Sequence, residues 1–235
     1  MKVLAIGCHP DDLEVNCFGT LARYIQRGDD VFVCNVANGC MGHMKILPKK
    51  LVSIRMKEAE KAVKVIGARE YFNLGVNDLE VVSYDKELIN KTIDIIRYTK
   101  PDVIITQAAN DYMRDHNEVH ELVFNAGFMS SIPHYKTKHP VHPIIPSIYF
   151  MEPSAGNAFI PTDYVDITET IELKLEALKC HKSQLDWLME HVGKDILKTT
   201  RANATFRGRL CSVSYAEAFL RCDRVLRITP SRLLP

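Results

Sequence analysis

The sequence lacks both a large net charge and a long apolar run. It has 30 Lys and Arg residues against 29 Asp and Glu residues, a formal net charge of +1. Such a balance gives no electrostatic reason to expect nucleic acid as a partner. No apolar run approaches the roughly 20 residues that a membrane-spanning helix needs. Hydrophobic residues still make up 46% of the 235 residues, which is enough for a buried core and excludes a disordered chain.

Paired cysteine motifs are also missing, because the seven cysteines form no CxxC pair. An odd number of scattered cysteines is typical of reduced thiols that pack as small hydrophobic side chains. We therefore expect a cytoplasmic protein without a membrane span. Cys8 stands beside His9, which leaves open a nucleophile or a zinc-binding thiolate, but its place after an apolar strand favours packing in the core.

Short β-branched runs alternate along the chain with longer amphipathic stretches. We predict strands over 3–7, 31–36, 71–74 and 102–106, and helices over 14–27, 49–66 and 85–99. Strands that are apolar on both faces and alternate with helices are typical of a parallel sheet covered on both sides. The sequence therefore predicts one α/β domain over 1–235, with a Rossmann-like, mostly parallel sheet flanked by helices on both faces.

The glycine pattern of a dinucleotide-binding fold is absent. The turn after the first strand reads Gly-Cys-His-Pro-Asp-Asp and has none of the GxGxxG spacing that a pyrophosphate requires. Two carboxylates at this point would also repel a phosphate. These features argue against binding of NAD in the usual way.

The stretch 130–158 differs in composition from the rest of the chain. It holds five of the 11 prolines, together with His134, His139 and His142. We expect it to be largely a loop, since long ordered loops often form lids or binding walls. A helix is predicted to follow from about 168 to 184, and Leu185, Trp187 and Leu188 beyond it are expected to pack or to contact another subunit.

A histidine and two carboxylates follow the first strand. His9, Asp11 and Asp12 stand at its carboxyl end, where open α/β sheets place their ligands. Burial of such a group is costly unless something uses it. His9 and Asp12 can converge on one metal ion, which leaves Asp11 free to handle a proton. Alternatively, Asp11 or Asp12 simply caps the helix that begins there.

A second polar cluster follows the strand over 102–106, so it is expected at the same edge of the sheet. His116 supplies a third ligand in this cluster, and the resulting set of two histidines and one carboxylate suits one catalytic Zn2+ per chain. The same set holds non-haem Fe2+ in other proteins, so Fe2+ stays an alternative. Asp115 is expected to orient a histidine from behind. His120, one helical turn later, is either a fourth ligand or a packing residue.

These motifs resemble the PIG-L/LmbE-like zinc deacetylase family. CHPDD at 8–12 with the following LEVNCFGT resembles the family's AHPDD-x-E-x-GCGGT start. Further matches follow in order along the chain: Arg55-Met56-Lys57-Glu58 with Gly67, Leu74-Gly75 with Asp78, Asp115-His116, Lys179 to Gln184, and Tyr215-Ala216-Glu217-Ala218-Phe219. Each motif alone is modest, but the ordered set is specific and spans nearly the whole chain.

The resemblance implies an amide hydrolase that releases acetate from a small N-acetylated glycoconjugate of the N-acetylglucosamine type. It implies that His9, Asp12 and His116 hold zinc and that Asp11 is the general base. Arg55 and Asp78 match positions that hold sugar hydroxyls, although a surface ion pair is the alternative for them. The resemblance also makes a homo-oligomer possible.

One position departs from the family pattern. Met113 stands where the family commonly has the first histidine of H-P-D-H, which is associated with oxyanion stabilisation or acid catalysis. Tyr112, His181 or another donor then has to contact the substrate in its place. The departure keeps two alternatives open: a metal-dependent hydratase or another hydrolase on the same fold, and a metal- or ligand-binding domain without catalysis.

Overall fold

Five parallel strands form the centre of the computed structural model, which describes residues 1–153, 156 and 158–235. They are β1 (Lys2–Gly7), β2 (Asp30–Ala37), β3 (Glu70–Val76), β4 (Val103–Gln107) and β5 (Ser147–Met151). Two antiparallel strands, β7 (Ala216–Arg221) and β6 (Asp163–Asp166), extend the sheet beyond β5. The strand order is β3-β2-β1-β4-β5-β7-β6. Its first five positions share the 3-2-1-4-5 order of the Rossmann fold, so the predicted mostly parallel α/β sheet is confirmed.

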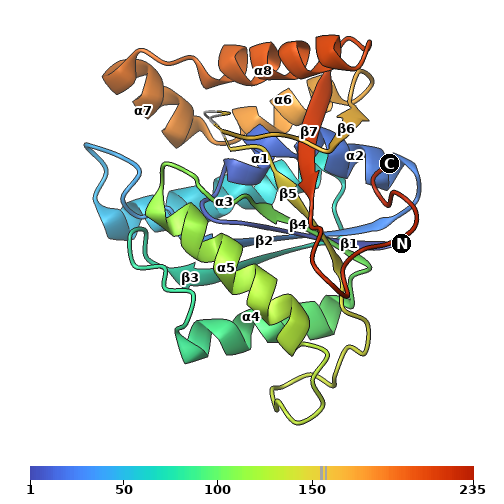
Figure 1. Cartoon of the computed structure of the whole chain (residues 1–235). Helices are drawn as coiled ribbons and strands as arrows, with labels where there is room; N and C mark the ends of the chain where they lie inside the picture. The colour runs from blue at the N-terminus through green and yellow to red at the C-terminus, as the bar shows by residue number, and fades with distance from the viewer. Residues whose placement is uncertain (154–155, 157) are drawn as a thin grey trace.

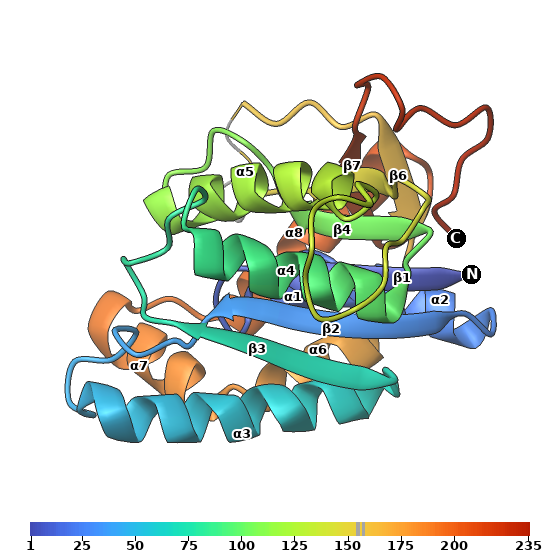
Figure 2. The same ribbon diagram turned by 90° about the horizontal axis from the view of Figure 1, so that it is seen from below.

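Helices cover both faces of this sheet (Figures 1 and 2). One face carries α1 (Asp12–Asn16), α2 (Phe18–Gln26), α3 (Pro48–Ile66), α6 (Ile171–Lys179) and α8 (Ile196–Leu210), and the other carries α4 (Lys86–Thr99) and α5 (Arg114–Met129). Strand β1 supplies both cores by alternation. Val3 and Ala5 belong to the first, whereas Leu4 and Ile6 belong to the second.

Several elements differ from the sequence-based expectation. The predicted helix over 14–27 is two helices that meet at Cys17, whose φ of −146° is not helical. The region 130–146 has no helix or strand, as expected, but β5 follows it and was not predicted. The stretch 154–155 and residue 157 of the expected loop lie outside the described residues. The predicted helix over 168–184 is α6 followed by α7 (Lys182–Val192), with a break at Cys180 and His181.

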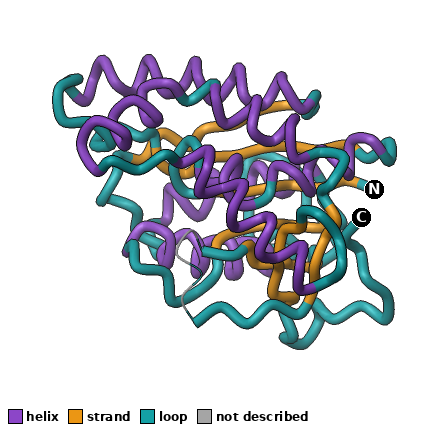
Figure 3. Tube along the Cα trace, turned by 90° about the horizontal axis from the view of Figure 1, so that it is seen from above, coloured by secondary structure: helices purple, strands orange, loops and turns teal. Residues whose placement is uncertain are grey.

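The two termini lie side by side at one end of the sheet in all three views (Figures 1, 2 and 3). Strand β1 runs from that end toward the opposite end, and β2, β3, β4 and β5 run parallel to it. The loops that follow the parallel strands therefore gather at the end away from the termini, where ligands of open α/β sheets bind. All seven cysteines are free thiols, as predicted. None of the helices in the described parts of the chain combines the length and apolar composition that a membrane crossing requires.

Candidate metal centre and its cavity

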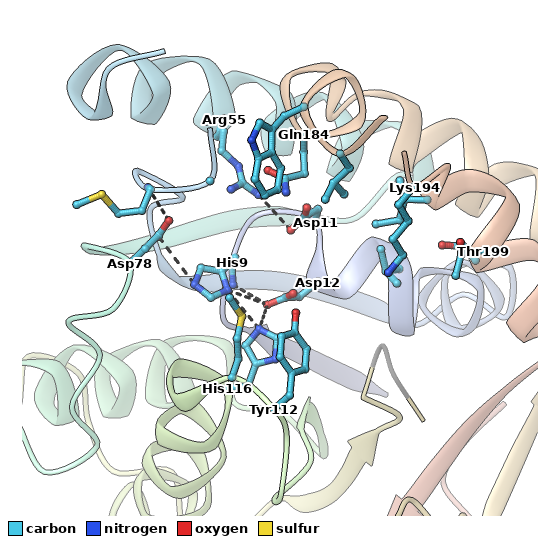
Figure 4. A pocket seen from close by; sticks show the side chains of 18 of the residues that line it. His9, Asp11, Asp12, Arg55, Asp78, Tyr112, His116, Gln184, Lys194 and Thr199 are labelled. Carbon is cyan, nitrogen blue, oxygen red and sulfur yellow. Dashed lines mark hydrogen bonds and ion pairs between the residues drawn. The ribbon is translucent and has the colours of Figure 1, made fainter. Parts of the chain in front are cut away.

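Three side chains from two strand ends converge at this edge of the sheet (Figure 4). His9 and Asp12 follow β1, and His116 lies in the first turn of α5 after β4. His9 Nδ1 lies 3.3 Å from His116 Nε2 and 3.5 Å from Asp12 Oδ2, and His116 Nε2 lies 3.3 Å from the same carboxylate oxygen. All three residues are buried, with exposed fractions of 9% or less. The structure therefore brings the three predicted ligands together.

This triangle of donor atoms fits a tetrahedral zinc ion. Zinc binds histidine nitrogen and carboxylate oxygen at about 2.0–2.2 Å, which spaces tetrahedral ligand atoms about 3.4 Å apart. The sides of the triangle, 3.3–3.5 Å, agree with that spacing. Three protein ligands also leave the open fourth position that is typical of catalytic zinc sites.

The electrostatics of the cluster favour a cation. Burial opposes protonation of His116, yet Asp12 and Asp111 outweigh it and raise the pKa of this ring to about 10. Burial likewise opposes ionisation of Asp12, but His116 and His9 outweigh it and hold the pKa of the carboxyl well below its usual range. Positive charge is thus stabilised between these side chains, whether protons or a divalent ion supply it.

A carboxylate stands behind each of the two histidines. Asp115 Oδ2 lies 3.2 Å from His9 Nε2, the nitrogen that does not face the triangle. Its second contact is the Leu79 amide, which donates to the same oxygen at 2.6 Å. Asp111 Oδ2 lies 2.9 Å from His116 Nδ1 in the same way. Carboxylates so placed fix the orientation of metal-binding histidines and raise their basicity. Asp115 was expected to orient a histidine, whereas Asp111 was missed because it stands in the loop before α5, five positions before the expected ligand.

Two further residues, which the sequence analysis did not identify, donate hydrogen bonds to the predicted ligands. The Gln107 side chain, at the end of β4, donates to Asp12 Oδ2 at 3.0 Å. The Asn35 side chain, on β2, donates to the His9 carbonyl at 2.8 Å. Both are buried polar residues in mainly apolar strands, Gln107 as the last residue of β4 and Asn35 two residues before the end of β2. That break in the apolar run is the one signal that the sequence offers for them.

Asp11 is held in a different way from its neighbour Asp12. Its backbone φ of 114° lies in the left-handed region, which is costly for a residue other than glycine and is found most often at functional sites. Its side chain makes no capping hydrogen bond to α1, so the capping alternative does not apply to Asp11. Its Oδ1 instead lies 3.1 Å from Arg55 Nη2. Burial raises the pKa of the Asp11 carboxyl to about 6, while Arg55 opposes that rise.

Arg55 is buried rather than at the surface, with 2% of its area exposed. It projects from α3, and its guanidinium also donates to the Pro10 carbonyl. A Cβ atom at Gly39 or Gly42 would lie 2.7 Å or 2.5 Å from the Arg55 side chain. These glycines therefore let the loop pass Arg55 closely. The surface-pair alternative for Arg55 is wrong.

Cys8 lies near the cluster but on its far side. Its Sγ is 3.7 Å from His9 Nε2, the nitrogen that faces Asp115, and not from the Nδ1 that faces Asp12. Burial raises the pKa of the Cys8 thiol to about 12. Although its sulfur lies within 4.8 Å of the three ligand atoms, a protonated, buried thiol is a poor metal ligand. The packing interpretation of Cys8 is favoured.

A cavity of about 360 Å³ opens above the three ligands. Its walls include Asp11, Arg55, Asp78, Tyr112 and Met113, together with residues of α7 and α8. Asp78 accepts hydrogen bonds from the Gly39 and Met41 amides at 2.8 Å each, so it is fixed at the wall. Trp187 and Leu188, which were expected to pack or to contact another subunit, also line the cavity.

Two predicted or possible site residues do not reach the cavity. His181 is fully buried, and its Nε2 lies 3.0 Å from Glu14 Oε1 on α1. It lies behind the wall, so contact with a substrate would require the ring to leave Glu14. His120 donates from Nδ1 to the Gln107 carbonyl at 3.0 Å, and its ring packs on Phe150. It is therefore a packing residue and not a fourth ligand.

The remaining motif residues hold elements together. Glu58 on α3 accepts hydrogen bonds from the Ser183 amide at 2.8 Å and the Ser183 hydroxyl at 2.6 Å, which ties α7 to α3. Glu217 on β7 accepts from the Gly19 and Thr20 amides at 3.0 and 2.7 Å and pairs with buried Lys174. These contacts explain why charged residues recur in motifs far from the cavity.

Fold and site together define an α/β protein with two histidines and one carboxylate that could hold a metal ion at the carboxyl ends of its parallel strands. The sequence model of one family, PIG-L: GlcNAc-PI de-N-acetylase, matches residues 4–127, just over half of the chain and the part that contains all three ligands. The chain belongs to this de-N-acetylase family.

Individual relatives agree with this assignment. The chain is 30% identical to the uncharacterized deacetylase YaiS of Escherichia coli over 184 residues, covering 77% of the chain and 90% of YaiS. Among solved structures, the N,N'-diacetylchitobiose deacetylase of Pyrococcus horikoshii superposes with a TM-score of 0.81 at 26% identity, covering 94% of this chain and 83% of that one. GalB of Pseudomonas putida, a 4-carboxy-2-hydroxymuconate hydratase, has a TM-score of 0.81 at 21% identity over 99% of this chain and all of GalB, which shows the shared fold alone.

Proposed function

We propose that this protein is a zinc-dependent hydrolase that removes the N-acetyl group from an N-acetylated sugar of the N-acetylglucosamine type. One observation carries the proposal: a zinc-sized triangle of His9, Asp12 and His116 stands at the base of a cavity, beside a carboxylate that is not part of the triangle. A protein that only binds metal has no use for this extra carboxylate, Asp11. Family membership and the deacetylase relatives support the same reaction.

His9 Nδ1, Asp12 Oδ2 and His116 Nε2 are the atoms that would hold the ion. When bound, zinc lowers the pKa of a coordinated water to about 7 and polarises the amide carbonyl of the substrate. Asp115 and Asp111 keep the two histidine rings turned toward the ion.

Asp11 is the general base of the proposed reaction. It lines the cavity next to the ligands, and its pKa, raised to about 6 by burial, brings the carboxylate closer to the proton affinity of a useful base. It accepts a proton from the attacking water and returns it to the nitrogen of the leaving amine. Arg55 keeps the carboxylate in place through its 3.1 Å contact.

Tyr112 is the donor that we assign to the carbonyl oxygen of the substrate. Its ring centre lies 6.2 Å from that of His116, and Figure 4 shows its hydroxyl directed into the cavity. Although 73% of Tyr112 is exposed, desolvation on the cavity side and the nearby Asp12 and Asp111 carboxylates raise its pKa, so the phenol keeps its proton. Met113 lines the same cavity and cannot donate. Asp78, fixed by two backbone amides, has further lone pairs that accept hydrogen bonds from sugar hydroxyls.

Acetate release from a panel of N-acetylated sugars tests the proposal. The panel contains N-acetylglucosamine, diacetylchitobiose and N-acetylglucosaminides of small alcohols, each assayed with the zinc-loaded and the iron-loaded protein. We expect acetate and free amine in equal amounts, with zinc supporting the reaction. Hydration of an unsaturated carboxylate without acetate release would establish the hydratase alternative instead. Action in the cytoplasm and assembly into a homo-oligomer stay predictions.

A further inference from the structure

The cavity wall that α7 forms carries uncharged side chains. Gln184, Trp187 and Leu188 line the cavity from this helix, and spacings of three and four residues place them on one face. The hydrogen bonds from Ser183 to Glu58 fix the first turn of α7 against α3, which holds this face toward the cavity. A carboxamide, an indole and an aliphatic chain suit a neutral ligand that carries hydroxyl groups, rather than an ion.

Gln184 has a buried acceptor atom that lacks a donor. No described residue donates a hydrogen bond to its Oε1, and the indole N–H of Trp187 is likewise buried and without an acceptor in the described chain. Buried polar atoms of folded proteins nearly always have a partner. Because both residues line the cavity, a ligand in the cavity can supply these partners.

A hydrogen-bond donor stands close to the Gln184 acceptor. A Cβ atom at Gly42 would lie 3.0 Å from Gln184 Oε1 and 2.5 Å from Arg55 Nη1, and Figure 4 shows the Arg55 and Gln184 side chains next to each other. The glycine therefore keeps both atoms uncovered. In the described chain, Arg55 Nη1 makes only a long hydrogen bond, 3.5 Å to the Gly39 carbonyl. A hydroxyl group can accept from the guanidinium and donate to the carboxamide at once, which neither a carboxylate nor an ether can do.

The position of Asp11 indicates which hydroxyl of the substrate this is. Arg55 Nη2 lies 3.1 Å from Asp11 Oδ1, and Asp11 is the proposed base, so the hydroxyl lies near the acetamido group that reacts. In a glycoside of N-acetylglucosamine, the ring carbon that bears this group stands between two others. One of them carries the glycosidic oxygen, which has no proton to donate, and the other carries the 3-hydroxyl. The 3-hydroxyl is therefore the nearest donor for Gln184.

We propose that Gln184 is a specificity-determining residue, which accepts a hydrogen bond from the free 3-hydroxyl of the substrate sugar while the Arg55 guanidinium donates to the same oxygen. The proposal deepens the proposed function, on which it rests. Its consequence is that the protein acts on N-acetylated sugars with a free 3-hydroxyl and discriminates against those that carry an ether or an ester at this position.

Three methyl glycosides test the proposal. They are the glycoside of N-acetylglucosamine, which is the parent, and its 3-deoxy-3-fluoro and 6-deoxy-6-fluoro analogues. Fluorine is close to a hydroxyl in size but cannot donate a hydrogen bond. We expect the wild-type protein to prefer the parent to the 3-fluoro analogue, with a ratio of the two kcat/KM values of about 3 to 10, the usual effect of losing one neutral hydrogen bond.

Gln184→Met removes the acceptor and nearly keeps the size of the side chain. It should lower kcat/KM about 3- to 10-fold for the parent and for the 6-fluoro analogue, but not for the 3-fluoro analogue, which has no proton to donate there. Gln184→Glu keeps an acceptor oxygen and should retain most of the preference for the parent. Asp186→Asn is the matched control, because Asp186 is exposed on the same helix and does not line the cavity, and it should leave all three values unchanged.

Two results would overturn the proposal. Equal losses for all three glycosides in Gln184→Met would show that the side chain supports the cavity without contacting the 3-hydroxyl. A loss for the parent and the 3-fluoro analogue but not for the 6-fluoro analogue would show that Gln184 contacts the 6-hydroxyl instead.

Binding separates this proposal from the reaction itself. If the parent glycoside releases no acetate, the proposed function fails, and calorimetry of the parent and the 3-fluoro analogue with the zinc-loaded protein then decides the recognition question. Tighter binding of the parent that Gln184→Met abolishes would support the contact. Equal binding of the two glycosides, or binding of neither, would reject it.

Discussion

The two sides of the cavity are built in opposite ways. On the strand side, the predicted ligands are held by neighbours: Asp12 contacts both histidines and Gln107, and a carboxylate stands behind each histidine ring. On the helix side, formed by α7 and α8, the Thr200 hydroxyl and the Trp187 indole have no partner in the described chain.

This difference separates the residues that would carry out the reaction from the residues that would select the substrate. A metal site needs ligands held in one geometry, which surrounding hydrogen bonds supply. A substrate wall needs polar groups that stay available until the substrate arrives. The family match, over residues 4–127, covers the strand side, whereas α7 and α8 lie beyond it. We therefore expect changes on the strand side to affect turnover and metal binding, and changes on the helix side to affect substrate preference.

The largest effect is expected for Asp11→Asn. The amide keeps the shape of the side chain but cannot accept the proton of the attacking water, so kcat should fall about 10²- to 10⁴-fold. The zinc content should stay at the wild-type level, because Asp11 is not a ligand. Steady-state kinetics and metal analysis of the same preparation check both parts, and unchanged kcat would remove Asp11 from the mechanism.

Asp111→Asn should weaken metal binding about 10- to 100-fold, since it removes the charge behind His116. Competition with a chromophoric chelator measures the affinity. Asp163→Asn, a change at the distant strand β6, is the control and should leave the affinity unchanged. If Asp111→Asn binds zinc as tightly as the wild type does, Asp111 does not orient His116.

Met113→His tests whether a cavity residue next to the predicted ligand His116 can supply the proton donor that the family pattern has at this position. Met113 lines the cavity without donating a proton, so a histidine there adds a donor near the reacting carbonyl. We expect kcat to rise, by about 10-fold if the added donor recovers part of what an oxyanion-hole group provides. A fall in kcat with unchanged zinc content would show that the methionine is suited to a different substrate or reaction.

Thr200→Val should have the smallest effect. No hydrogen bond within the described chain is lost, so thermal stability should stay the same or rise slightly. KM for the preferred substrate should rise about 3- to 10-fold, which is the usual loss of affinity when one neutral hydrogen bond is removed. We expect kcat to stay nearly unchanged. A loss of stability with unchanged KM would mean that the hydroxyl has a structural role.

The strand side could be predicted from the sequence because its residues follow strands. His9, Asp12 and His116 each come after an apolar run, and parallel strands bring their carboxyl ends to one edge. Asp111 could not be predicted in this way, because its distance from His116 depends on a loop in which the Asn117 side chain accepts from the Asp111 amide and donates to the Asp111 carbonyl. The place of Trp187 in the cavity wall could not be predicted either, because the chain breaks at Cys180 and His181, which starts α7 as a separate helix over the cavity.

The unpredicted strands have a similar explanation. β5 is five residues long and follows a proline-rich stretch that carries no periodic pattern. β6 and β7 complete the sheet through antiparallel pairing between segments 50 or more residues apart. Short strands of this kind form because a partner edge is present, and that information is not local in the sequence.

The metal content of the purified protein tests the central claim most directly. Protein purified without chelator or nickel affinity resin is analysed by mass spectrometry beside an Asp12→Ala variant whose folding is checked by circular dichroism. The account predicts close to one zinc per chain in the wild type and almost none in the folded variant. Absence of metal from the wild type, persisting after zinc is added back, would contradict the account and leave the triangle of His9, Asp12 and His116 as a polar cluster without a metal.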